Sequence, residues 1–292
     1  MEFTTAEELL ALCSSEKMTI ADVMRRREVT QGEMSSDTVE ERMKKALAIM
    51  RDSAHRPMNE TLPSRGGMIG GEAAKLSAHA AAGKSICGSV LTKALIYSQA
   101  VPEVNASMGV IVAAPTAGSS GVLPAVLFAL EEEFDLDEST VLDGLFTAGA
   151  VGYLLMHNAS VAGAEAGCQA EVGSASAMAA AAAVAMFGGS PEQSLDAASI
   201  ALSNLLGLVC DPIAGLVEAP CQSRNAAGAA NAITSAESVL SGIKAVVPFS
   251  EMAEAMYRVG KRLAPELRET ALGGCAATPT GCAYKCSIFG CK

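Results

Sequence analysis

The sequence predicts a mostly α-helical fold, and three features of its composition and patterning support this. Half of the 292 residues are apolar, which is enough for a sizeable core. There is no Trp and aromatic residues make up only 4%, so small and aliphatic side chains must fill that core and let helices approach closely. Alternating β-branched segments are scarce, and residues 110–112 are the best strand candidate. We therefore expect one multi-helix domain over 1–292, with long functional loops between the helices.

Residues 1–60 form a polar, helical N-terminal part. Thr5 and Glu8 stand at capping-box spacing before an apolar run, which predicts a helix start. A second short helix is expected from Thr19, and a third over 36–52, where apolar residues recur on one face. The many charges here are typical of a solvated helical surface.

A loop rich in proline and glycine follows at 56–71. Its last part, 64–71, leads into a helix from Glu72, so its backbone amides could face an anion at that helix start. A plain flexible connector is the alternative.

From there the chain predicts one helix after another. Apolar periodicity and capping signals indicate helices over 73–82, 90–99, 122–133, 139–156, 173–187, 191–206, 226–241, 251–260 and 265–270. The start at Ser190 is the clearest, because this residue suits the N-cap and Pro191 suits the first turn.

Charge and cysteine usage restrict the function classes. The net charge of −11 argues against a nucleic-acid surface, which would need a basic face. Nine cysteines in a chain of this length do not indicate a disulfide scaffold, and the first eight residues carry three acids instead of a secretory signal. We expect a reducing, cytoplasmic environment, where clustered cysteines bind metal or do chemistry.

Three uncharged segments are long enough to span a bilayer, at 104–130, 144–164 and 172–191. They contain prolines, hydroxyl residues or mostly Ala, Gly and Ser, and no cluster of Lys or Arg flanks them. We expect them to be buried helices and loops, with no membrane partner.

One candidate substrate loop lies at 114–121, before an apolar helix. It offers the hydroxyls of Thr116, Ser119 and Ser120, with Gly118 as a hinge. Free amides and short hydroxyls at a helix start suit an anion. Because the loop lacks the lysine of a phosphate-binding P-loop, a small carboxylate is the better candidate. An ordinary N-cap and turn is the alternative.

Three further polar residues are candidates for handling the substrate. Asn158 can orient a ligand, since its amide both donates and accepts hydrogen bonds. His157 is a candidate catalytic base, although a lone His at an apolar helix end is more often structural. Glu171 is the rival proton carrier, and a helix-start acid is its alternative role.

Cys168, Cys210 and Cys221 are the candidate metal ligands. Each has small residues, Gly or Pro close by, where the backbone can turn and aim a thiolate. Their spacing is not the tight pattern of a zinc site or a ferredoxin, so buried free cysteines remain an alternative. Three thiolates on an iron-sulfur cluster would leave one iron open to act as a Lewis acid.

The chain resembles the α subunit of bacterial iron-sulfur-dependent L-serine dehydratases. The residues that carry the resemblance lie at 103–121, 158–160, 167–173, 207–212, 214–221, 224–229 and 267–271. The resemblance implies a [4Fe-4S] cluster held by Cys168, Cys210 and Cys221, and conversion of L-serine to pyruvate and ammonia. It also implies a mostly helical catalytic subunit joined to a separate β subunit in a hetero-oligomer. Substrate contacts are expected from the 114–121 loop and Asn158.

Two segments depart from the family pattern. The family has Ser-Gly-Leu-Thr-Gly-Gly where this chain has Arg65 to Gly71, and the missing hydroxyls put a substrate role of that loop in question. The tail over 275–292 is rich in cysteine, at Cys275, Cys282, Cys286 and Cys291. One hypothesis is that a tail thiolate, most readily Cys291, caps the open iron in the resting state. Adventitious surface thiols are the alternative.

The sequence leaves other interpretations of the function open. The same cluster chemistry could act on L-cysteine or L-threonine, since the sequence does not reveal the pocket volume. A zinc-stapled helical scaffold or a membrane-associated helical protein is the non-enzymatic alternative.

Overall fold

The computed structural model describes residues 2–290, and its N-terminal helices form as expected. The first helix, α1 (Ala6–Glu16), begins at a capping box between Thr5 and Glu8. A second capping box opens α2 (Ile20–Gln31), and a serine N-cap opens α3 (Ser36–His55). These local signals satisfy the first free backbone amides of each helix, which explains why the starts were predictable.

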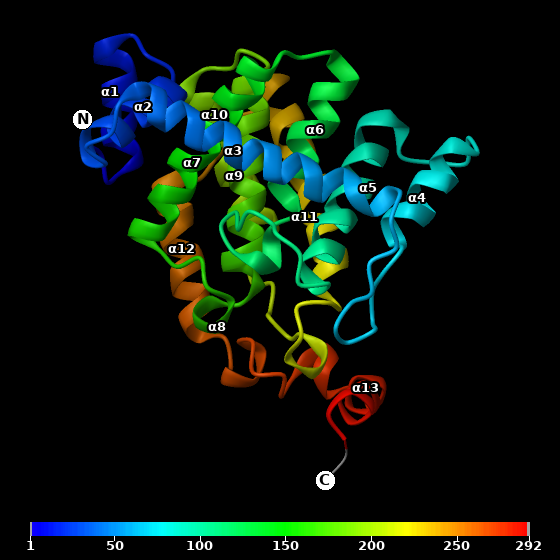
Figure 1. Ribbon diagram of the computed structural model, residues 1–292. Coiled ribbons are helices and arrows are strands. Elements are labelled where there is room, and N and C mark those ends of the chain that lie inside the picture. The colour runs from blue at the N-terminus through cyan, green and yellow to red at the C-terminus, as the bar shows by residue number, and fades with distance from the viewer. Residues whose placement is uncertain (1, 291–292) are drawn as a thin grey trace.

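The rest of the described chain is also helical, which confirms the mostly α fold. The remaining helices are α4 (Glu72–Ala81), α5 (Gly88–Ala106), α6 (Val122–Phe134), α7 (Glu138–Asn158), α8 (Gly163–Ala166), α9 (Ser174–Met186), α10 (Pro191–Asn204), α11 (Cys221–Leu240), α12 (Phe249–Arg262) and α13 (Pro279–Phe289). Short helical turns of other kinds link several of them. Figure 1 shows α1 near one end of the molecule and α8 and α13 near the other.

Three expectations differ from the structure. Residues 110–112 form no strand, and within the described chain the only β-type pairing is a single bridge between Cys210 and Arg268. The helix predicted over 265–270 is only a 3-10 turn, Pro265–Leu267, because the residues after it pair with Cys210 instead. The C-terminal helix α13 was not predicted, since its apolar residues show little helical periodicity.

The helix α9 lies at the centre of the fold. Twelve of its thirteen residues are buried, and it packs against α6, α7, α10 and α11. A helix that is apolar on all sides belongs in a core, and its alanines allow close neighbours. One contact shows how close: a Cβ at Gly144 of α7 would lie 2.8 Å from Cγ of Met186.

One continuous hydrophobic core joins this centre to the N-terminal helices, extending from Phe3 to Met256 in the sequence. Helix α2 packs on α7, and α3 packs on α5 and α7. Of the described helices, α7 alone is long and apolar enough to cross a membrane, but 67% of its most apolar window is buried by the protein itself. Burial of that kind is expected of a core helix.

The helices α9 and α11 run side by side in the same direction. In the first turn of α9 the Ser176 hydroxyl donates to the carbonyl of Gly228 in α11 at 2.8 Å, and a Cβ at Gly228 would lie 2.7 Å from Cγ1 of Val172. Further along both helices, Ala183 of α9 and Leu240 of α11 line one cavity. Both helix starts therefore lie at one end of the core, and both helix ends lie at the other.

Candidate active site

Of the three candidate cysteines, Cys168 and Cys210 share one close group, whereas Cys221 lies nearby at the start of α11 but outside that group. Cys168 precedes a π-helical turn, Gln169–Gly173 (η3), that leads into α9, and Cys221 is the first residue of α11. Cys210 comes from the loop after α10. All three are buried and none is in a disulfide. A π-helical turn is rare and often marks a functional site.

Glu171 completes this group. One of its carboxylate oxygens, Oε2, lies 3.6 Å from Sγ of Cys210 and 3.9 Å from Sγ of Cys168. The ligand atoms of these three residues all lie within 4.8 Å of one another, close enough to share one metal-bearing group. The sequence singled out all three, and the structure places them in contact.

The hydroxyl loop, residues 114–121, contacts the same carboxylate of Glu171. Thr116 donates its hydroxyl to Oε1 of Glu171 at 2.8 Å, and its oxygen lies 3.2 Å from Oγ of Ser119. Ser120 turns away from Glu171 and donates to the carbonyl of Ala117. Of the predicted substrate hydroxyls, that of Thr116 therefore contacts Glu171 directly. The Ser119 hydroxyl contacts that of Thr116 instead.

Glycines make room for Glu171 on two sides. A Cβ at Gly118 would lie 3.3 Å from Oε1 of Glu171. A Cβ at Gly163 would lie 2.5 Å from Oε2 of Glu171 and 3.0 Å from Sγ of Cys210. No side chain fits at Gly163 without moving the carboxylate, so this glycine is part of the geometry of the candidate site.

The electrostatic surroundings oppose negative charge in the absence of a cation. Burial raises the pKa of Glu171 and that of the Cys221 thiol. The pKa of Cys210 is raised by its contact with Cys168 and then by burial. These shifts favour the protonated thiols of Cys210 and Cys221, so binding a metal group there must release protons. The N-terminus of α11, which begins at Cys221, favours the thiolate form once such a group is bound.

Two side chains from the first turn of α11 tie the cysteine loops to each other. Arg224 donates from Nη1 to the carbonyl of Val209 at 2.9 Å and lies 3.7 Å from Sγ of Cys168. It also forms an ion pair with Asp211 at 2.6 Å. This guanidinium therefore holds the loop of Cys210 against Cys168 and places a positive charge beside the thiols.

Asn225 makes the corresponding link to the hydroxyl loop. Its amide donates to the carbonyls of Gly118 and Cys221, both at 2.8 Å, and accepts from the backbone amide of Gly121 at 2.9 Å. The sequence predicted no individual role for Asn225 or Arg224. Both lie in the segment 224–229, which carries the family resemblance, just before the helix expected over 226–241.

The glycine-rich loop does face an anion, and that anion belongs to the protein. Glu218 accepts from the Ser64 hydroxyl at 2.9 Å and from the amides of Gly66 and Met68 at 2.5 and 3.0 Å. Glu103 accepts from two amides at the start of α4, those of Gly71 and Ala73. Since Glu218 lies three residues before Cys221, these hydrogen bonds attach the glycine-rich loop to the segment between Cys210 and Cys221.

The C-terminal segment also closes against the cysteines. The amide of Cys210 donates to the carbonyl of Leu267 at 2.9 Å, and the amide of Glu269 donates to the carbonyl of Cys210 at 2.7 Å. Further along, the Cys275 amide donates to Asp211 at 2.6 Å. Helix α13 packs on the turn Ile213–Gly215 (η4), between Cys210 and Cys221. The cysteine-rich tail thus begins beside the candidate site, whereas Cys291 lies outside the described residues.

The structure does not bring His157 and Asn158 to the cysteines. His157 is exposed at the end of α7 and stacks on Tyr153. The Asn158 amide donates to the carbonyls of Thr4 and Leu154, at 2.7 and 2.9 Å. Both residues lie where α7 meets the N-terminus, and their roles in catalysis and substrate binding stay predictions.

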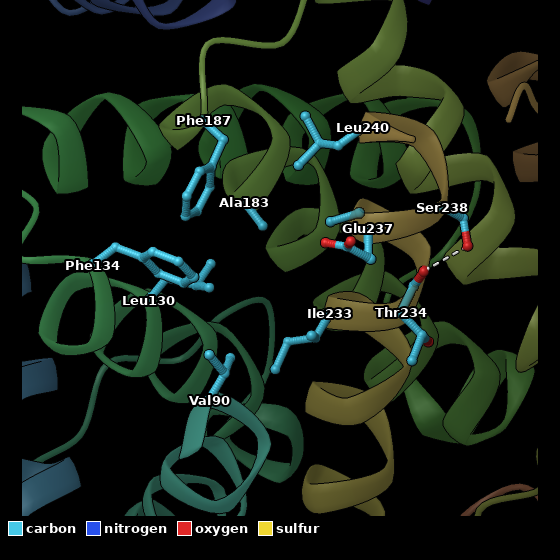
Figure 2. Close-up of a pocket in the computed structure, with 11 residues that line it drawn as sticks. Val90, Leu130, Phe134, Ala183, Phe187, Ile233, Thr234, Glu237, Ser238 and Leu240 are labelled. Atoms are coloured by element: carbon cyan, nitrogen blue, oxygen red, sulfur yellow. Dashed lines mark hydrogen bonds between the residues drawn. The ribbon is translucent and has the colours of Figure 1, made fainter. Parts of the chain in front are cut away.

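A cavity in the described part of the chain lies elsewhere. It has a volume of about 750 Å³ and is lined by the ends of α6, α9 and α11, with Val90 from α5. Figure 2 shows Phe134, Phe187, Leu240 and Ile233 around it, with Glu237 the one acid drawn. No cysteine or histidine lines it, so this cavity offers no ligands for a metal and no imidazole base.

Comparison with known proteins agrees with the cysteine site. The family model for the serine dehydratase alpha chain matches residues 15–276. The chain belongs to this family. It is 46% identical over 288 residues to the "Probable L-serine dehydratase, alpha chain" of Bacillus subtilis, covering 99% of this chain and 96% of that one. It is 45% identical over 277 residues to the "L-serine dehydratase, alpha chain" of Peptoniphilus asaccharolyticus, covering 95% of each.

A third member of the serine dehydratase group has a longer chain. The "L-serine dehydratase" of Helicobacter pylori is 36% identical over 283 residues, which cover 95% of this chain but only 62% of that protein. More than a third of that relative therefore has no counterpart here, whereas the proteins called alpha chains match from end to end.

The candidate site fits an iron-sulfur group by its donor chemistry. It offers three buried thiols, which are the usual ligands of such clusters, from three separate loops at one end of the core. The Cys221 thiol is 6% exposed and makes no hydrogen bond among the described residues, as expected of a side chain that binds a group other than protein. Arg224 lies beside the thiols to offset the negative charge of a thiolate cluster.

Proposed function

We propose that this serine dehydratase alpha chain removes water from L-serine, giving pyruvate and ammonia, with a [4Fe-4S] cluster held by Cys168, Cys210 and Cys221. The observation that supports this most is the convergence of the Cys168 and Cys210 thiols on the Glu171 carboxylate, which also accepts from the Thr116 hydroxyl. When bound, the cluster supplies an iron without a protein ligand, which makes hydroxide a better leaving group.

Glu171 is the better candidate for the base of this reaction, and His157 the poorer one. The carboxylate of Glu171 lies among the thiols, whereas the His157 ring is on the surface at the end of α7. Glu171 takes the proton from Cα of serine, the electron pair forms the Cα–Cβ double bond, and hydroxide leaves Cβ. The resulting aminoacrylate hydrolyses in water to pyruvate and ammonia.

The loop 114–121 positions the substrate in this proposal. Thr116 and Ser119 offer hydroxyls beside Glu171, and Gly118 lets the backbone approach the carboxylate. Asn225 fixes that loop to the first turn of α11, so that Thr116 and Cys221 keep a constant separation. Orientation of this kind contributes strongly to rate, since small displacements of reacting groups are costly.

A separate β subunit completes the enzyme in a hetero-oligomer. Three relatives are named alpha chains, a name that implies a second kind of chain. The complex works in the cytoplasm, where thiols stay reduced and available for the cluster.

Anaerobic expression of the chain with its β subunit tests this proposal. A brown protein with iron and sulfide that forms pyruvate from L-serine is expected. A colourless protein that holds zinc, or a brown protein that leaves L-serine unchanged, would refute it. Assays with L-threonine and L-cysteine in parallel decide the preference among substrates that undergo the same elimination.

A further inference from the structure

The side chain of Gln169 is a buried amide at the start of the π-helical turn η3, and the proposed reaction does not use it. It is 1% exposed. Its Nε2 donates to the carbonyl of Met256 in α12 at 2.9 Å, and its Oε1 accepts from the backbone amide of Gly207 at 2.8 Å. The backbone amide of Gln169 donates to the carbonyl of Leu208 at 2.9 Å. Gln169 therefore attaches η3 both to α12 and to the loop that leads into Cys210.

Two glycines allow the Gln169 side chain to make these hydrogen bonds. Gly260 lies one helical turn after Met256, and a Cβ there would lie 3.0 Å from Nε2 of Gln169, so a side chain would crowd the approach of the amide to α12. Gly207 has a φ of 88°, in the left-handed region where a side chain is strained, yet a Cβ there would meet nothing within 4 Å. Glycine at 207 thus serves the direction of the backbone whose amide donates to Gln169.

The turn η3 sets the direction of two residues of the candidate site. A π-helical turn is rare, so the contacts around it must favour it over an α-helical turn. Each residue of an α-helix advances by about 100° around the axis, and the one extra residue of a π-helical turn rotates what precedes it by about that angle. Cys168 precedes η3 and Glu171 lies within it. The approach of Oε2 of Glu171 to Sγ of Cys168 and of Cys210, at 3.9 and 3.6 Å, therefore depends on this turn.

We propose that Gln169 is a positioning residue, whose side-chain amide imposes the π-helical turn and so sets the direction from which Cys168 and Glu171 face Cys210. This inference rests on the proposed function and adds to it a residue that touches no reacting atom. An apolar side chain in its place would leave the Gly207 amide without its acceptor, which removes the reason for η3 to keep its extra residue. The carboxylate of Glu171 would then move, and a shift of about 1 Å in a reacting group can cost roughly a hundredfold in rate.

The first test compares Gln169→Met with Gln222→Met in the complete enzyme with its β subunit. Gln222 is a matched control, because it is also a buried glutamine directly after a candidate ligand, and its Nε2 donates to the carbonyl of Gln99 in α5 at 3.1 Å. Gln222 lies in an ordinary α-helix, however. We expect Gln169→Met to lower kcat per bound iron about tenfold or more with little change in KM for L-serine, and Gln222→Met to change kcat by a smaller factor. Equal kcat in the two variants would overturn the proposal.

A milder pair of variants decides the question if Gln169→Met does not fold. Gly207→Ala strains the backbone whose amide donates to Gln169, and Gly188→Ala applies the same kind of strain at the end of α9, since Gly188 has a φ of 73° and equally free space around its Cβ. We expect Gly207→Ala to lower kcat per bound iron severalfold and Gly188→Ala to keep the wild-type value. Equal kcat in these two variants would contradict the role of the Gln169 side chain.

A crystal structure of the Gln169→Met complex keeps this inference distinct from the proposed reaction. We expect residues 169–173 to form an α-helical turn in the variant, with Sγ of Cys168 farther from Oε2 of Glu171 than the 3.9 Å of the wild type. A π-helical turn that persists in the variant would overturn the proposal. If the wild-type complex makes no pyruvate, the proposed function fails on its own, and the crystal structure still decides whether Gln169 imposes the turn.

Discussion

The two ends of the α9–α11 pair differ in almost every chemical respect. At the helix starts, buried thiols, a carboxylate and a guanidinium converge from loops far apart in the sequence. At the helix ends, about 30 Å away along the 20 residues of α11, aromatic and aliphatic side chains surround an open cavity. The cavity of about 750 Å³ is at the apolar end, and the groups able to do chemistry are at the other. The candidate site is therefore found from the convergence of polar groups, not from cavity volume.

Replacing a ligand cysteine should have the largest effect. We expect Cys210→Ser or Cys221→Ser to lose bound iron and to reduce pyruvate formation to background, because a hydroxyl is a poor ligand for iron in such clusters. Cys13 is the matched control, since it is also buried but lies in α1. Iron content measured with turnover checks this, and a Cys13→Ser variant that loses iron equally would count against the assignment.

Filling the space beside Glu171 should be the next most damaging change. In Gly163→Ala the new methyl group would displace the carboxylate, and a shift of about 1 Å in a reacting group can cost roughly a hundredfold in rate. Gly149→Ala in α7 is the control, because the nearest atom to its Cβ is 3.9 Å away. Turnover is expressed per bound iron in both variants, because the new methyl group at Gly163 would also lie 3.0 Å from Sγ of Cys210. Unchanged turnover in Gly163→Ala would contradict a catalytic role of Glu171.

Removing the guanidinium beside Cys168 should have an intermediate effect. Arg224→Gln loses the ion pair with Asp211 and the charge next to the thiols, so we expect retention of iron to fall by about tenfold to a hundredfold. The exposed Arg258, which pairs with Glu254 on α12, is the control. Competition with an iron chelator measures the difference, and equal retention in the two variants would contradict it.

Changing the apolar end should affect stability alone. Phe134 is 50% exposed and packs edge-on against Phe187, so Phe134→Ala should cost about 1 kcal/mol of unfolding free energy. Turnover per iron-loaded molecule should equal that of the wild type. Chemical denaturation and steady-state rates check the two statements, and a drop in turnover would mean that the two ends are coupled.

The helices were predictable wherever their signals are local. The start at Ser190 formed as expected, because the side chain caps its own helix and Pro191 fits the first turn. The turn at Pro265–Leu267 was not predictable, since pairing with Cys210, far away in the sequence, replaced the expected helix. Helix α5 likewise passes through Pro102, where burial of its neighbours offsets the usual cost of proline.

The residues of the candidate site also fall into those that the sequence predicted and those that it did not. The cysteines, Glu171 and Thr116 were found from the chemistry of their side chains and the turns that carry them. Arg224 and Asn225 lie in a segment that carries the family resemblance, but their residue types alone predicted no role for either. Their roles arise from contacts made across the fold, which a pattern of residue types does not contain.

The pairing of Leu267 and Glu269 with Cys210 has a consequence for how the protein is made. The ribosome synthesises the chain from its N-terminus, so all three cysteines emerge before the segment of Leu267 and Glu269 that pairs with Cys210. Until that last stretch is synthesised, the backbone groups of Cys210 have no pairing segment and the thiols stand in an unfinished pocket. The candidate metal site therefore takes its final form only after nearly all of the helical core has been synthesised.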